Sequence, residues 1–97
     1  MADALSQKVQ DQIRRAQLPQ SGEVPFIPKL STNRRGQQII EKAEVRFGPK
    51  KGKIGYLDAS GRIWIRDRAH ANDPDHWDVQ IEDGIDYIRV GLNGEPL

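Results

Sequence analysis

The sequence predicts a single α+β domain, in which N-terminal helices pack on one face of a small, twisted antiparallel sheet of about four strands. Three observations support this prediction. The chain has 97 residues, which suits one domain. Apolar residues recur at helical spacing over 4–18, and the period changes to two after the glycine-rich stretch 48–55. We therefore expect a helical and extended part over 1–47 and an antiparallel sheet over 48–97.

Two helices are predicted in the N-terminal part. The first covers 4–18, where the apolar residues fall on one face, and Pro19 ends it. An extended connector with three prolines follows over 19–32. The second helix is predicted over 33–43, because the residues at 31–33 are all capable N-caps.

Strands are predicted wherever apolar and polar residues alternate. Residues 56–58 and 62–66 indicate a hairpin around the turn at 59–61. The segment 76–82 alternates strictly, and 85–92 indicates the next strand. These segments make up the predicted sheet.

Composition excludes several classes of site. The chain has no cysteine, which excludes disulfides, thiolate zinc sites and cysteine nucleophiles. Its apolar runs are too short to cross a membrane, and its first residues lack the apolar core of an export signal. Residues 1–70 have a net charge of +7 and residues 71–97 one of −6. A basic body beside an acidic end hints at a polyanionic partner.

Strand alternation assigns the side chains of the predicted sheet to two faces. The apolar set, which includes Ile63 and Ile65, must face the helices because nothing else in the chain can cover it. The opposite face then collects polar and aromatic side chains, namely Trp64, Arg66, His76, Asp78, Gln80, Tyr87 and Arg89. A plain solvated sheet face is the alternative interpretation of the same pattern.

The polar set suits cleavage of an RNA phosphodiester through the neighbouring 2′-hydroxyl, which needs an acid, a base and fixed positive charge. His76 and Asp78 could supply the acid–base pair, or Asp78 could orient the His76 imidazole. Arg66 and Arg89 could stabilise charge on the phosphoryl oxygens. Gln80 could bond a base edge or a phosphate. This route needs no metal, and we assign no cofactor.

Further side chains are candidates for binding the substrate. Trp64 and Tyr87 offer flat surfaces for an unstacked base. Five cations could attract the RNA backbone, namely Lys50, Lys51, Lys53, Arg62 and Arg68. A metal cluster is the alternative for the residues around the two histidines, although the spacing of His70 and His76 matches no tight metal motif.

A family resemblance appears over about half of the chain, residues 48–92. The run Gly48-Pro49-Lys50-Lys51-Gly52-Lys53, the pattern Gly61-x-x-Trp64 and the run His76-Trp77-Asp78-Val79-Gln80 resemble C-terminal toxin domains of bacterial polymorphic toxins. These are the variable tips of contact-dependent inhibition and Rhs-type proteins.

The Trp-Asp-x-Gln run also resembles the cytotoxic domain of ribosome-cleaving colicins, which are ribonucleases. In that family the Asp of the run is catalytic, which would correspond to Asp78. The residue after the Gln is a catalytic His in colicins but Ile81 in this chain. If the resemblance holds, His76 or His70 supplies the imidazole.

The resemblance implies a toxin for interbacterial competition that cleaves tRNA or rRNA. It implies delivery as the C-terminal part of a larger toxin, action in the cytoplasm of the target cell, and neutralisation by a cognate immunity protein. We expect a monomer that forms a heterodimer with this inhibitor and does not bind membranes. Two alternatives stay open: a metal-dependent DNase toxin, and a non-enzymatic module that binds through the polar sheet face.

Overall fold

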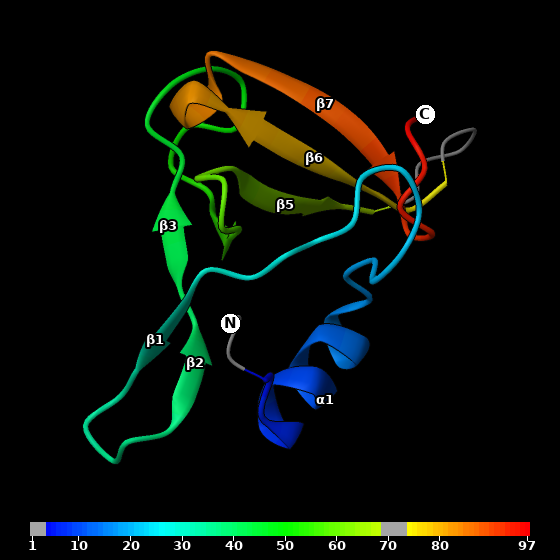
Figure 1. The fold of residues 1–97 in the computed structure, drawn as a ribbon. Coiled ribbons are helices and arrows are strands. Elements are labelled where there is room, and N and C mark those ends of the chain that lie inside the picture. Colours follow the sequence, from blue (N-terminus) through cyan, green and yellow to red (C-terminus); the bar gives the residue numbers. More distant parts are fainter. Residues whose placement is uncertain (1–3, 69–73) are drawn as a thin grey trace.

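The protein is mostly β in a computed structural model that describes residues 4–68 and 74–97 (Figure 1). The described part contains one α-helix and seven strands in two antiparallel sheets, so the predicted packing of helices on a sheet of about four strands is wrong. The elements are α1 (Gln7–Ala16), β1 (Leu30–Thr32), β2 (Gln38–Ile40), β3 (Lys42–Glu44), β4 (Ile54–Leu57), β5 (Ile63–Asp67), β6 (His76–Ile81), the 3₁₀ helix η1 (Glu82–Gly84) and β7 (Asp86–Gly91).

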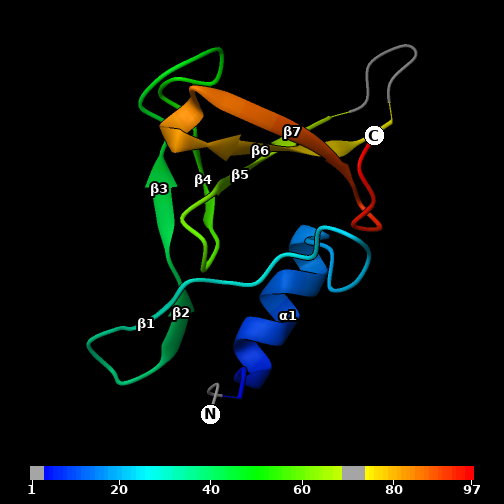
Figure 2. The same cartoon turned by 45° about the horizontal axis from the view of Figure 1, so that its top comes forward.

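The larger sheet has five strands in chain order, β3-β4-β5-β6-β7, with every neighbouring pair antiparallel. It curves over α1, while β1 and β2 form a separate hairpin that projects beside the helix (Figures 1 and 2). The strands expected at 76–82 and 85–92 and the hairpin around 59–61 are confirmed. The sheet begins before residue 48, because β3 is its first strand.

The first predicted helix is confirmed, although it is shorter than expected. Ser6 caps it, since its Oγ accepts a hydrogen bond from the N–H of Val9 at 3.2 Å. It ends where Gln17 adopts a left-handed conformation. Val9 and Ile13 are buried beneath it. Among the described residues, neither this helix nor any other is long and apolar enough to cross a membrane.

The second predicted helix, over 33–43, is wrong. Residues 33–36 form the turn of the β1–β2 hairpin, and the rest of the segment contributes to β2 and β3. The Oδ1 of Asn33 accepts hydrogen bonds from the N–H groups of Arg35 and Gln37, each at 2.9 Å. Gly36 has a φ of +76°, which favours glycine. Turn chemistry at Asn33 and Gly36 therefore prevails over the N-cap pattern.

The main core lies between α1 and the sheet face that covers it, here called the helix face. Two tryptophans from neighbouring strands form its centre, with ring centroids 6.1 Å apart. Phe26, from the connector, packs edge-on against Trp64 at 5.3 Å. The buried members are Val9, Ile13, Leu18, Phe26, Ile40, Trp64, Trp77, Val79 and Val90. The connector after α1 is thus part of the core.

The opposite side of the sheet, here called the outer face, has a smaller apolar cluster of Val45, Ile63 and Ile65. The prediction that Ile63 and Ile65 face the helices is therefore wrong. Trp64 points to the helix face instead, as its place in the main core shows. Residues 63 to 65 are all buried, so this strand is covered on both faces and alternation of polarity cannot orient it.

Candidate active site on the outer face

Polar side chains of β6 and β7 gather on the outer face. The register pairs Asp78 with Ile65 on one side and with Arg89 on the other, and cross-strand partners share a face. Gln80 is likewise paired with Ile63 and Tyr87. The predicted grouping of His76, Asp78, Gln80, Tyr87 and Arg89 on one face is confirmed, and this face is the one that α1 leaves uncovered.

His76 lies between two carboxylates at the end of this face. Its Nε2 is 3.1 Å from Oδ1 of Asp78 and 3.3 Å from Oδ2 of Asp67. Its Nδ1 is 3.0 Å from the carbonyl oxygen of Pro74. His76 and Asp78 are 2% and 4% exposed, so the contacts between them are shielded from water.

The partners of the imidazole are all hydrogen-bond acceptors. A carbonyl oxygen and carboxylate oxygens lie within reach of the two ring nitrogens, so an N–H at either position of the ring has an acceptor. The ring then fixes the positions of both carboxylates. His76 is in this respect a positioning residue, placed behind the carboxylates.

Lys50 adds a positive charge to the cluster. Its Nζ is 3.4 Å from Oδ2 of Asp78, the oxygen that His76 does not contact, and its side chain is only 28% exposed. Burial strengthens such an ion pair relative to one in water. Asp78 therefore lies between a lysine on one oxygen and a histidine on the other.

The loop 46–53 brings Lys50 to this position because it is docked on η1. The N–H groups of Arg46 and Phe47 both donate to the carbonyl oxygen of Asp83, at 3.2 and 2.9 Å. Gly48 and Gly84, with φ of +81° and +103°, meet so closely that a Cβ on either would collide with the backbone of the other segment. The docking thus requires glycine on both sides.

A small cavity of about 200 Å³ opens at the cluster. Its lining contains two carboxylates, two cations and an aromatic ring, and consists of Pro49, Lys50, Asp67, Asp78, Tyr87 and Arg89. Carboxylates can transfer protons, and Lys50 and Arg89 can stabilise negative charge on a phosphoryl group. Tyr87, which is 39% exposed, offers a surface at the cavity.

Several predicted site residues lie elsewhere. Trp64 is fully buried on the helix face, where its Nε1 donates to Asp58 Oδ2 at 2.9 Å, so it offers no surface to a base. Arg66 also points away from the cavity, donating to Ala16 O and Gln17 Oε1 at 3.2 and 2.8 Å. The prediction that these two side chains join His76 is wrong, because β5 has the opposite orientation.

The other candidates are spread around the site. Gln80 is 1% exposed and donates to Asp78 O at 3.1 Å, so it lies buried beneath the face. This position is contrary to the expectation that Gln80 bonds a base edge or a phosphate. Arg62 is held by Asp58 at 2.8 Å. Lys51 and Lys53 are exposed on the loop that contains Lys50.

His70 lies outside the described residues. Asp67, in contrast, belongs to the site although it was not predicted. It follows Ile63 and Ile65 at a spacing of two and thus shares their face, which alternation assigned to the helices. The available signal was the antiparallel pairing of β5 with β6, which places it opposite His76. Asp67 was missed because the two faces of β5 were assigned the wrong way round.

One group among the described residues has the composition of a metal site. The ligand atoms of Asp67, His76 and Asp78 all lie within 4.8 Å of one another. The contact of Nδ1 with Pro74 O is also typical of a metal-ligating histidine. The Lys50 ammonium already supplies positive charge at Asp78, which favours a cluster held by hydrogen bonds.

Comparisons with protein-family models, with curated proteins and with solved structures found no match to this chain, so its functional interpretation rests on the geometry of the site and on the sequence resemblance.

Proposed function

We propose that the chain is a ribonuclease domain of a bacterial toxin, which cleaves RNA without a metal and is neutralised by an immunity protein. The observation that supports this best is the cavity on the outer face. It presents Asp67 and Asp78 beside Lys50 and Arg89, with His76 buried behind the carboxylates. Acid–base groups and fixed positive charge are what phosphodiester cleavage through the 2′-hydroxyl requires.

In the proposed reaction, Asp78 accepts the proton of the 2′-hydroxyl, and Asp67 lies beside it in the cavity. The 2′-oxygen bonds to phosphorus while the bond from phosphorus to the 5′-oxygen breaks, which gives a 2′,3′-cyclic phosphate and a 5′-hydroxyl. The departing oxygen takes a proton from Lys50 or from water. Lys50 and Arg89 balance the charge that develops on the phosphoryl oxygens.

The toxin context comes from the resemblance of the run His76-Trp77-Asp78-Val79-Gln80 to polymorphic toxin domains. The structure adds a physical reason for its arrangement. Trp77 and Val79 pack in the main core while the polar members of the run face the cavity side. One strand therefore contributes both to the core and to the proposed site.

A metal-dependent nuclease is the second candidate, favoured by the Asp67, His76 and Asp78 cluster. It differs from the first in one measurable respect. A metal-independent enzyme keeps its activity in EDTA, whereas a nuclease that needs a divalent ion at this cluster loses it.

The test compares three proteins on total bacterial RNA, with and without EDTA. We expect the unaltered chain to cleave in both conditions and Asp78→Asn to lose at least about 100-fold in rate, as removal of a general acid or base does. Asp86→Asn is the matched control, because Asp86 is an exposed residue of β7 that does not line the cavity.

Three results would contradict the proposal. Full cleavage by Asp78→Asn would show that Asp78 is not the proton acceptor. Loss of cleavage in EDTA would favour the metal-dependent candidate. RNA binding without cleavage by the unaltered chain would favour a binding module. Growth arrest on production in a bacterial cytoplasm, relieved by Asp78→Asn, tests the toxin part separately.

A further inference from the structure

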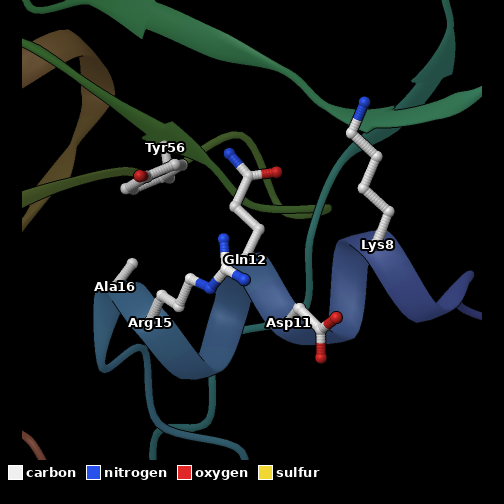
Figure 3. Close-up of a pocket in the computed structure, with 6 residues that line it drawn as sticks. All are labelled: Lys8, Asp11, Gln12, Arg15, Ala16 and Tyr56. Carbon is white, nitrogen blue, oxygen red and sulfur yellow. The ribbon is translucent and has the colours of Figure 1, made fainter.

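A second concave surface lies on the helix face, on the other side of the sheet from the cavity. Two adjoining hollows, of about 680 and 310 Å³, share Arg15, Ala16 and Tyr56 and so form one groove between α1 and the sheet. We call it the α1 groove and define it by Lys8, Arg15, Tyr56, Arg66, Arg68 and Trp77. Figure 3 shows its larger hollow, with Tyr56 on the sheet side and Lys8 and Arg15 on the helix.

The charge of the groove is strongly positive and mostly uncompensated. Lys8, Arg15 and Arg68 form no ion pair among the residues that the structure describes. The acidic lining residue, Asp11, is already paired with Arg14. Because like charges in one hollow repel each other, their convergence favours an anionic ligand.

An aromatic ring forms part of the wall. Tyr56 is held edge-on by Phe26 and Trp77, with centroids 6.4 and 6.3 Å away. Lys42 Nζ lies 5.4 Å from its centroid. The ring is partly exposed, and in Figure 3 it lies above Ala16 and Arg15. It is thus a fixed, flat surface in a cationic groove.

We propose that the α1 groove binds single-stranded RNA, with phosphates on Lys8, Arg15 and Arg68 and a base stacked on Tyr56. A basic groove with a stacking ring is the arrangement by which proteins hold single strands. This deepens the proposed function and rests on it for the identity of RNA as ligand. Arg66 and Asp67 are successive residues of β5, so the groove and the cavity lie on the two faces of the same strand end.

An acidic protein surface is the competing ligand for the same cations. It would use Lys8 and Arg15 but would gain little from the face of Tyr56, because carboxylates do not stack on an aromatic ring. The ring therefore distinguishes the two ligands. A substitution at Tyr56 tests the stacking, whereas substitutions on the helix test the charge.

The experiment measures binding in an Asp78→Asn background, so that cleavage does not consume the probe. The probe is a fluorescein-labelled single-stranded RNA of about 12 nucleotides, within the usual site size of a small domain. Lys8→Gln with Arg15→Gln should weaken binding by about tenfold and reduce the salt slope by about 1.4, as expected for two phosphates on a single strand.

The matched control is Arg34→Gln with Arg35→Gln, which removes the same charge from the exposed tip of the β1–β2 hairpin. It should change the affinity by less than about twofold. Equal losses in the two double variants would overturn the proposal, because the effect would then be one of net charge alone. All four side chains are exposed, so neither change threatens the fold.

Tyr56→Leu should weaken binding while Tyr56→Phe should not, because phenylalanine also stacks. Unchanged binding in Tyr56→Leu, with displacement of the RNA by polyglutamate, would overturn the proposal in favour of an acidic protein ligand. The outcome is separable from the proposed function. RNA cleavage with no effect of the helix substitutions rejects the groove alone, whereas groove-dependent binding without cleavage by the unaltered chain rejects the ribonuclease alone.

Discussion

His76 holds two carboxylates together in a place with little water. Its Nε2 contacts Asp78 at 3.1 Å and Asp67 at 3.3 Å, and its side chain is 3% exposed. Removal of the imidazole breaks both of these contacts at a buried position, which is more damaging than loss of an exposed pair. Substitution of His76 should therefore affect stability as well as chemistry.

We predict that His76→Ala lowers the free energy of unfolding by about 3 kcal/mol, because Asp67 and Asp78 then face each other without the imidazole. Asp67→Asn in the same chain should recover at least about 1 kcal/mol of this loss, since it removes one of the two charges. Urea unfolding of the two single variants and the double variant measures the coupling. Asp86→Asn in place of Asp67→Asn is the control and should show none. Effects that add to within about 0.5 kcal/mol would contradict the coupling.

At the level of single residues, the sequence identifies β6 and β7 well, because His76, Asp78 and Gln80 alternate with buried Trp77 and Val79. It does not identify the cavity. Trp64 and its two isoleucine neighbours are all apolar, so a pattern of polarity has no information about which of them faces α1. Because Trp64 was assigned to the wrong face, Arg66 was included in the predicted site and Asp67 was left out of it.

The loop 46–53 and η1 are the two elements that bring Lys50 to Asp78. Their contact depends on Gly48 and Gly84, whose backbones meet without room for a Cβ. The loop contributes Lys50 to the cavity, and no residue of η1 lines it. The contribution of η1 to the proposed reaction is therefore to place the loop.

We predict that Gly84→Ala reduces RNA cleavage by at least about tenfold, because the new methyl group displaces Phe47 and the loop that follows, and a small misplacement of a catalytic group is costly. Rates on total RNA, beside circular dichroism to verify the fold, measure the effect. Gly61→Ala is a matched control, since Gly61 has a φ of +85° but open space around it. Both variants share the strain of a left-handed alanine, about 1–2 kcal/mol, and only one has the collision. Equal rates in the two variants would show that loop docking does not position Lys50.

Element boundaries on the N-terminal side could not be predicted from periodicity alone. Ile39, Ile40 and Ala43 fit one face of a helix, and they fit equally well two three-residue strands on either side of Glu41. The decisive signal was the turn, in which Asn33 bonds ahead to two N–H groups and Gly36 adopts a positive φ.

At the level of the whole molecule, one sheet serves two surfaces. Its helix face holds the main core and borders the α1 groove, and its outer face holds the cavity. The fold class was mispredicted because strands of three residues, such as β1 and β3, are too short to show alternation. α1 closes the core from one side and should therefore be indispensable.

We predict that a chain starting at Gln20 does not fold, because it leaves Trp64, Trp77, Val79 and Val90 without their cover. Dispersion of amide signals in a proton–nitrogen NMR spectrum measures this. Replacement of the four-residue turn 33–36 by Asn-Gly is the control and should leave the spectrum dispersed, since the tip of that hairpin is exposed. A folded chain without α1 would mean that the sheet is stable through its own strands.

Both tryptophans of the protein, Trp64 and Trp77, lie in contact beneath α1, and none is on the outer face. Intrinsic fluorescence is therefore an optical report of one side of the sheet only. Emission spectra should follow detachment of the helix and respond to a ligand that stacks on Tyr56 beside Trp77. A nucleotide that enters the cavity would leave them nearly unchanged, so titrations there call for an extrinsic dye or for NMR.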